Sequence, residues 1–242
     1  MIGPVALVGA GEFTAALREL DAELLAATGR GRPRVAVVPT ASFPDGEEAF
    51  LRVAARAVDH FAALGAEVEV VLITDRSAAS DPEWVQALGE ADLIDLAGGD
   101  PGHLSRTLLG TPAWESVLSA TARGAVLVGC DAGAVALAAR RAERRRGHLP
   151  CPLRWRAALG VVEGAAVLTR CDRRPDVLAA LAALQAPRGI AILGLDEGAA
   201  VIGRDGVWQV RGSGRVTVWR GRDRVRHSRG DVFRLQPPAA GR

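Results

Sequence analysis

The strongest constraint on the fold of this chain is the alternation of short apolar runs with longer amphipathic segments. Short segments rich in apolar residues, at 5–8, 34–38, 67–73, 93–96 and 125–128, are separated by stretches in which apolar residues recur at helical spacing. Strands that alternate with helices pair in parallel through right-handed crossovers, and helices then cover both faces of the sheet. The pattern therefore predicts an α/β fold with a mostly parallel sheet.

The segments between the runs predict helices over 13–25, 47–64, 111–123 and 132–146, and a further helix that begins at Asp81-Pro82-Glu83. Asp caps a helix well, and Pro in the first turn lacks an N–H that would otherwise be unpaired. Gly65 is placed to end the second helix.

The pattern changes after residue 190. Short strands are expected at 190–195, 199–202, 207–210 and 215–219, with turns at Gly206 and Gly212. We interpret them as an antiparallel extension at one edge of the same sheet. The expected organisation is a single α/β domain over residues 1–220, followed by a polar tail over 221–242 that frays.

Composition excludes several classes of protein. Of the 242 residues, 49% are hydrophobic and 24% are charged, which argues against disorder. All 30 basic residues are arginine, yet the formal net charge is only +2. A chain this close to neutral has no strong overall attraction to nucleic acid or anionic membranes.

Cysteine usage bears on compartment and metal binding. Cys130, Cys151 and Cys171 are odd in number and include no Cys-x-x-Cys motif, which argues against a disulfide framework and a structural zinc site. The first residues lack the pattern of a signal peptide, and no run is apolar enough for a membrane helix, so neither is expected. A cytoplasmic protein without metal or cofactor is expected.

Two loops at the carboxyl ends of predicted strands carry the candidate site, because ligands of such sheets bind at that edge. The first is Gly98-Gly99-Asp100, whose N–H groups would supply half of an oxyanion hole. The second is Gly129-Cys130-Asp131-Ala132-Gly133, with the spacing of a nucleophile elbow around Asp131. A helix N-terminus behind Asp131 favours negative charge there.

The sequence resembles the cyanophycinase and dipeptidase E family of serine peptidases, within the class I glutamine amidotransferase-like fold. The resemblance implies a three-layer, flavodoxin-like architecture. Six ordered blocks between about residues 5 and 218 carry it; they lie at 5–12, 38–42, 91–100, 129–134, 193–197 and 212–218.

The resemblance also shows where the chain departs from the family. The family pattern at the second loop is Gly-Thr-Ser-Ala-Gly-Ala, and Asp131 stands in the position of its serine. The family's Asp-x-His-Phe stretch corresponds to Asp172-Arg173-Arg174-Pro175, so Arg174 stands where the catalytic His is expected. We therefore expect an ion pair between Asp131 and Arg174, whose loss is destabilising. Asp196-Glu197 matches a family Asp-Glu pair, for which substrate positioning and a plain polar turn both remain open.

Two hypotheses of function follow. One is a catalytically inactive homologue whose cleft binds a peptide-like or acidic small ligand, or a protein partner. The other is a hydrolase that uses Asp131 or an unrecognised nucleophile, with His103 as the histidine nearest that sheet edge. Cys130 is expected to be buried and inert. The arginine runs at 140–146 and 220–229 are expected to be solvated faces rather than contacts to nucleic acid or membrane, and a homodimer remains open.

Overall fold

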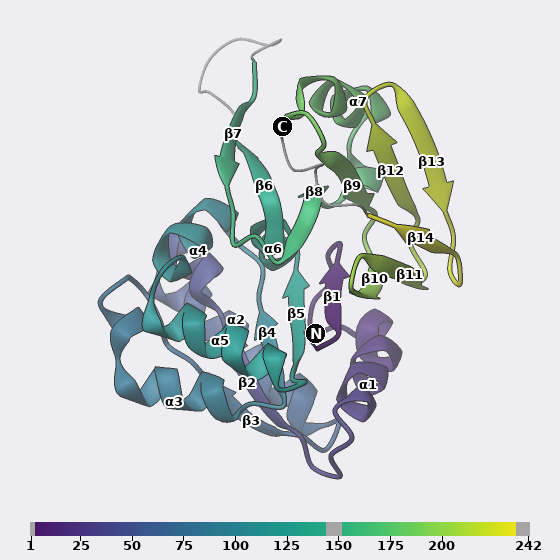
Figure 1. Ribbon diagram of the computed structural model, residues 1–242. Helices are drawn as coiled ribbons and strands as arrows, with labels where there is room; N and C mark the ends of the chain where they lie inside the picture. Colours follow the sequence, from purple (N-terminus) through teal and green to yellow (C-terminus); the bar gives the residue numbers. More distant parts are fainter. Residues whose placement is uncertain (1–2, 144–151, 236–242) are drawn as a thin grey trace.

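The computed structural model describes residues 3–143 and 152–235, which build two β-sheets joined by a continuous hydrophobic core (Figure 1). The strands are β1 (Val5–Val8), β2 (Arg34–Val38), β3 (Glu67–Val70), β4 (Leu93–Leu96), β5 (Val126–Cys130), β6 (Ala138–Glu143), β7 (Arg154–Ala157), β8 (Val162–Leu168), β9 (Ala191–Leu195), β10 (Ala199–Arg204), β11 (Val207–Gly212), β12 (Val216–Arg220), β13 (Asp223–His227) and β14 (Val232–Arg234). The helices are α1 (Arg18–Ala27), α2 (Glu47–Ala62), α3 (Pro82–Glu90), α4 (Pro101–Leu108), α5 (Pro112–Ala122), α6 (Ala132–Leu137) and α7 (Asp176–Gln185), with a short 3-10 turn η4 (Cys171–Arg173).

The first sheet contains the predicted parallel strands. Its spatial order is β14-β11-β10-β1-β5-β4-β2-β3. The neighbouring pairs β1–β5, β5–β4, β4–β2 and β2–β3 are all parallel. Strands β10, β11 and β14 continue the sheet beyond β1 in antiparallel pairing. The prediction of a mostly parallel sheet with an antiparallel C-terminal extension is therefore confirmed for this sheet.

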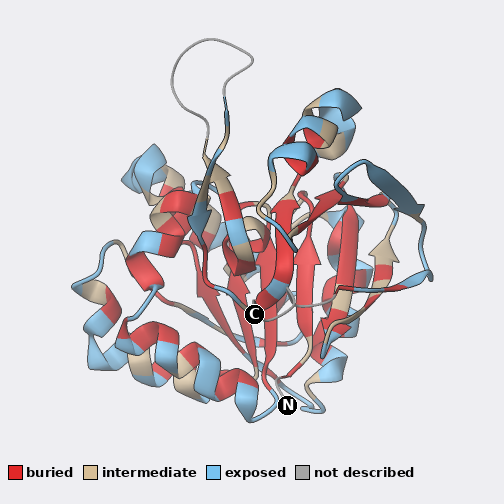
Figure 2. Ribbon diagram, turned by 45° about the horizontal axis from the view of Figure 1, so that its top comes forward, coloured by how far each residue is buried: buried red, intermediate tan, exposed pale blue. Residues whose placement is uncertain are grey.

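Helices cover both faces of this sheet, so that it is the middle of three layers. On one face α1 and α2 pack over Leu93, and on the other α3, α4 and α5 pack over Ile94, its neighbour in β4. Successive strand residues point to opposite faces, so a continuous apolar strand feeds both cores. Figure 2 shows the result, with buried strands inside and exposed residues on the outer sides of the helices.

A second sheet follows the parallel core in the chain. Its order is β13-β12-β9-β8-β6-β7, with parallel pairs β6–β8 and β8–β9 and antiparallel pairs elsewhere. Val167 and Leu193 face the main core, and on the opposite face α7 packs its alanines against Ile192 and Trp219. Sequence analysis makes no prediction for the strands and helix between 152 and 189.

Three expectations about the C-terminal half are wrong. The helix expected over 132–146 ends at Leu137, and β6 follows because its pairing with β7 and β8 overrides the helix propensity of an Ala- and Arg-rich segment. Strands β9 and β12 belong to the second sheet and do not extend the first. The segment after residue 220 forms β13 and β14 instead of a frayed tail, since it finds partners in β12 and β11. Residues 144–146 and 236–242 lie outside the described part.

Within the described residues, no helix has both the length and the apolar character that crossing a bilayer requires.

Helix α6 begins in close contact with β4. A Cβ added at Gly133 would collide with the carbonyl oxygen of Leu96, which is main chain and cannot move aside alone. We expect Gly133→Ala to lower the free energy of unfolding by about 1–3 kcal/mol, the usual cost of overpacking. Urea unfolding measures it. The control is Gly31→Ala, an exposed position with open space around its Cβ, for which a change within about 0.5 kcal/mol is expected. Equal midpoints for the two variants would contradict the packing argument.

Candidate active site

Asp131 occupies the sharp turn between β5 and α6. Its φ of 47° and ψ of −105° are unusual for a residue with a side chain. The turn is anchored at its start, because the Asp131 N–H donates to the Val8 carbonyl at 3.0 Å. Strand β5 pairs in parallel with β1 on one side and β4 on the other, so the turn that holds Asp131 lies at the carboxyl edge of an inner strand.

Both carboxylate oxygens of Asp131 are engaged by residues that follow β8. The Thr169 hydroxyl donates to Oδ1 at 2.7 Å, and the Arg170 guanidinium donates to Oδ2 at 2.8 Å. The expected ion pair with Arg174 is therefore wrong: the partner is Arg170. The reason is local, since Thr169 and Arg170 leave β8 directly beside the turn, whereas η4 intervenes before Arg174.

A cleft of about 570 Å³ opens beside this turn. Of the residues predicted for the site, Gly98, Gly99, Asp131, Ala132 and Arg174 line it. Its other charged lining residues are Glu12, Asp45, Arg52 and Arg170. Arg174 is exposed, and among the described residues its guanidinium has no hydrogen bond or ion pair. The cleft thus contains one arginine that is free to meet a ligand.

Glu12 lines the cleft, although sequence analysis gives it no role. It lies shortly after β1, and its carboxylate accepts the Gly98 N–H at 2.7 Å. Burial raises the pKa of Glu12, the Gly98 N–H opposes that shift, and the nearby Asp131 carboxylate adds to it. One of the two glycine N–H groups expected to form an oxyanion hole is therefore already bonded.

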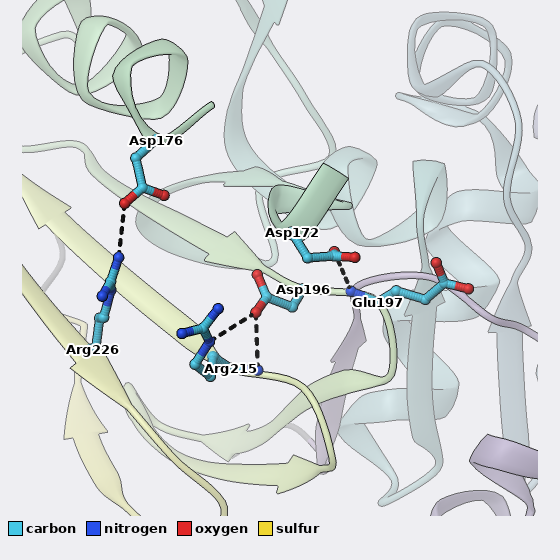
Figure 3. A network of polar contacts seen from close by, with 6 residues as sticks. All are labelled: Asp172, Asp176, Asp196, Glu197, Arg215 and Arg226. Atoms are coloured by element: carbon cyan, nitrogen blue, oxygen red, sulfur yellow. Dashed lines mark hydrogen bonds and ion pairs between the residues drawn. The ribbon is translucent and has the colours of Figure 1, made fainter. Parts of the chain in front are cut away.

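Asp172, Asp196 and Glu197 lie together but outside the cleft lining (Figure 3). Asp172 accepts the Glu197 N–H at 2.8 Å, and Glu197 forms an ion pair with Arg173. Asp196 accepts from Arg215, through its main-chain N–H at 3.3 Å and its Nε at 3.4 Å. These contacts tie η4 and the 213–215 turn to the β9–β10 connection.

Asp100 also serves the main chain. Its carboxylate accepts the His103 N–H at 2.7 Å and thereby caps α4. It lies beside the cleft rather than in its lining.

His103 is turned away from Asp131. Its Nε2 is 3.0 Å from the Thr74 carbonyl oxygen, and its ring stacks on Phe43. Elsewhere in the described chain, His60 lies 2.7 Å from Asp21 and His227 stacks on Phe233. None of these rings lines the cleft, and His148 lies outside the described residues.

Cys130 is buried, as expected from its place one residue before the turn. Burial raises the pKa of its thiol well above the ordinary value, so the thiolate that would act as a nucleophile is disfavoured. Cys151 lies outside the described residues.

The arginine runs do not form one basic surface. Arg141 is buried and pairs with Glu143 at 2.7 Å. Arg224 and Arg226 both bind Asp176, and Arg229 pairs with Glu19. Within the described ranges, 3–143 and 152–235, no group of three or more His, Cys, Asp or Glu side chains is placed to hold a metal ion.

Three site residues escaped sequence analysis: Glu12, Thr169 and Arg170. The sequence does indicate the last two, because Thr169 and Arg170 directly follow the mostly apolar segment that forms β8. Glu12 follows β1 only after a glycine-rich turn, and nothing local indicates that its side chain reaches the loop after β4.

The pairing of Asp131 is testable by double-mutant cycles that combine Asp131→Asn with Arg170→Ala or with Arg174→Ala. We expect a coupling of about 0.5–1 kcal/mol for Arg170, whose side chain is partly exposed and screened by solvent. For Arg174 the expected coupling is near zero. Chemical unfolding of the single and double variants gives both values, and a larger coupling for Arg174 would refute the assignment.

Comparisons with known proteins agree with this architecture. The profile of peptidase family S51 matches residues 5–210. The crystal structure of a peptidase from an acI-B1 actinobacterium superposes with a TM-score of 0.85 at 28% identity, over 97% of each chain. A Listeria monocytogenes EGD-e protein proposed to be a peptidase E superposes with a TM-score of 0.65 at 19% identity, over 88% of this chain and 99% of the other. Among curated proteins, none matches this sequence.

The family match covers most of the chain, and the solved structures share its fold. The resemblance inferred from the ordered sequence blocks is thereby confirmed, together with the flavodoxin-like fold class: this chain belongs to peptidase family S51.

Proposed function

We propose that this S51 protein lacks serine-peptidase activity and uses the cleft beside Asp131 to bind a small peptide-like or acidic ligand. The observation that carries the proposal is a contrast within one cleft. Both oxygens of the Asp131 carboxylate are bonded to the protein, while the Arg174 guanidinium has no partner among the described residues.

The chemistry of a serine peptidase requires a hydroxyl nucleophile and a base that removes its proton. The family's serine position holds Asp131, and its histidine position holds Arg174. The described histidines do not line the cleft, so none replaces the missing base there. This supports a binding protein over a serine peptidase.

The cleft suits a ligand of dipeptide size with a carboxylate. Its volume of about 570 Å³ falls in the range typical of small-molecule sites. Arg174 can bind a carboxylate through two parallel hydrogen bonds, a geometry that a guanidinium favours. Arg52 and Arg170 also line the cleft, but each already pairs with an acidic side chain.

A cytoplasmic location belongs to the same proposal. Cys130 and Cys171 are free thiols, as is usual for proteins of reducing compartments.

The proposal predicts binding without turnover. Calorimetric titration with the dipeptide Asp-Ala should show saturable binding, and chromatography should show no cleavage above background. Arg174→Ala should weaken binding by about tenfold, the value expected for loss of one charge-assisted contact. The matched control is Arg32→Ala, an exposed arginine outside the cleft, which should leave the affinity unchanged. Absence of binding, or equal affinity of the Arg174 variant and the parent, would count against the proposal.

A hydrolase remains the second candidate, favoured by the strained backbone of Asp131 and by the Glu12 carboxyl on the same cleft. Two acidic groups in different environments are a common arrangement for acid–base chemistry. Turnover of peptide or ester substrates that disappears in Asp131→Asn would establish this reading and displace the first.

A further inference from the structure

Glu12, which follows β1, forms a hydrogen bond to the loop that follows β4. Its carboxylate accepts the Gly98 N–H at 2.7 Å, across 86 positions of sequence. This N–H matters chemically, because a main-chain N–H in a loop at the carboxyl edge of the sheet is the kind of donor that a bound oxyanion would use. With Glu12 in place, that donor is occupied.

Glu12, Gly98 and Asp131 form one contiguous surface. A Cβ built on Gly98 would lie 3.1 Å from each Glu12 carboxylate oxygen and 3.3 Å from the Asp131 Cβ. All three residues line the cleft. We call this surface the cleft floor.

The cleft floor carries two carboxylates, those of Glu12 and Asp131, and they have different partners. Arg170 pairs with Asp131, but within the described part of the chain no arginine forms an ion pair with the Glu12 carboxylate. Arg56 donates to the main-chain carbonyl of Glu12 at 3.1 Å, and its charge lowers the pKa of the Glu12 carboxyl and so favours its ionised form. The free guanidinium of Arg174 belongs to the same cleft, so the cleft has a negative floor and a positive group elsewhere.

We infer that Glu12 is a specificity-determining residue. Its carboxylate occupies the Gly98 N–H and gives the cleft floor a negative charge that repels anions. The floor therefore binds the amide or amine of a ligand, while Arg174 binds the ligand's carboxylate. The inference rests on the proposed function, since it concerns which ligands the cleft admits. A neutral carboxamide that replaces one carboxylate of a small diacid should therefore bind better than the diacid.

The test compares succinate with its half-amide, succinamate, by calorimetric titration at pH 8. The parent protein should bind succinamate about tenfold more tightly than succinate, a difference that corresponds to one well-placed charge interaction. Glu12→Gln keeps the size of the side chain and an acceptor for the Gly98 N–H, and should reduce the preference to within about twofold. Glu12→Ala also frees the Gly98 N–H, and should bind succinate more tightly still.

Asp59→Asn is the matched control, because it removes the same charge at an exposed position outside the cleft and should keep the parent's preference. If Glu12→Ala does not fold, Glu12→Gln decides alone. An unchanged preference in Glu12→Gln, or no binding of either probe by any variant, overturns the inference. Succinate binding that appears only after substitution of Glu12 supports it. Asp-Ala binding and its loss in Arg174→Ala judge the proposed function separately.

Discussion

Helix α6 starts so close to β4 that the main chain leaves no room for a side chain at Gly133. That contact forces β5 to end in a tight turn, and Asp131 takes the positive φ that the turn requires. The side chain at this position must therefore leave the sheet at its carboxyl edge, where ligands of parallel sheets bind. The geometry is independent of which residue stands there, so a family fold can persist when the chemistry of the position changes.

Side-chain bonds of Asp131 at this turn link the two sheets. Asp131 follows β5 of the first sheet, and its partners Thr169 and Arg170 follow β8 of the second. A half-buried carboxylate is costly to leave unpaired, so these bonds stabilise the junction between the sheets. They also compete with any ligand or proton that would use Asp131. Asp131 thus links the two sheets through two carboxylate oxygens. A serine at this position would offer one hydroxyl oxygen and no charge for Arg170 to pair with.

Charge is distributed unevenly in the cleft. Glu12 and Asp131 form its floor, while the guanidinium of Arg174 is free of protein partners among the described residues. Burial and the neighbouring Asp131 raise the pKa of Glu12, whereas the Gly98 N–H and the charge of Arg56 lower it. A ligand with one donor end and one anionic end matches this arrangement better than a diacid does.

The sequence by itself determined the parallel core. Continuous apolar runs and caps such as Asp81 are local signals, and the strands at 5–8, 34–38 and 93–96 agree with β1, β2 and β4. The two glycine-containing loops were likewise recognisable, because chain order places them at one sheet edge. Only the tertiary structure decided that 138–143 is a strand, that Arg170 rather than Arg174 meets Asp131, and that Glu12 bonds Gly98. These outcomes depend on partners far away in the chain, and periodicity carries no information about such contacts.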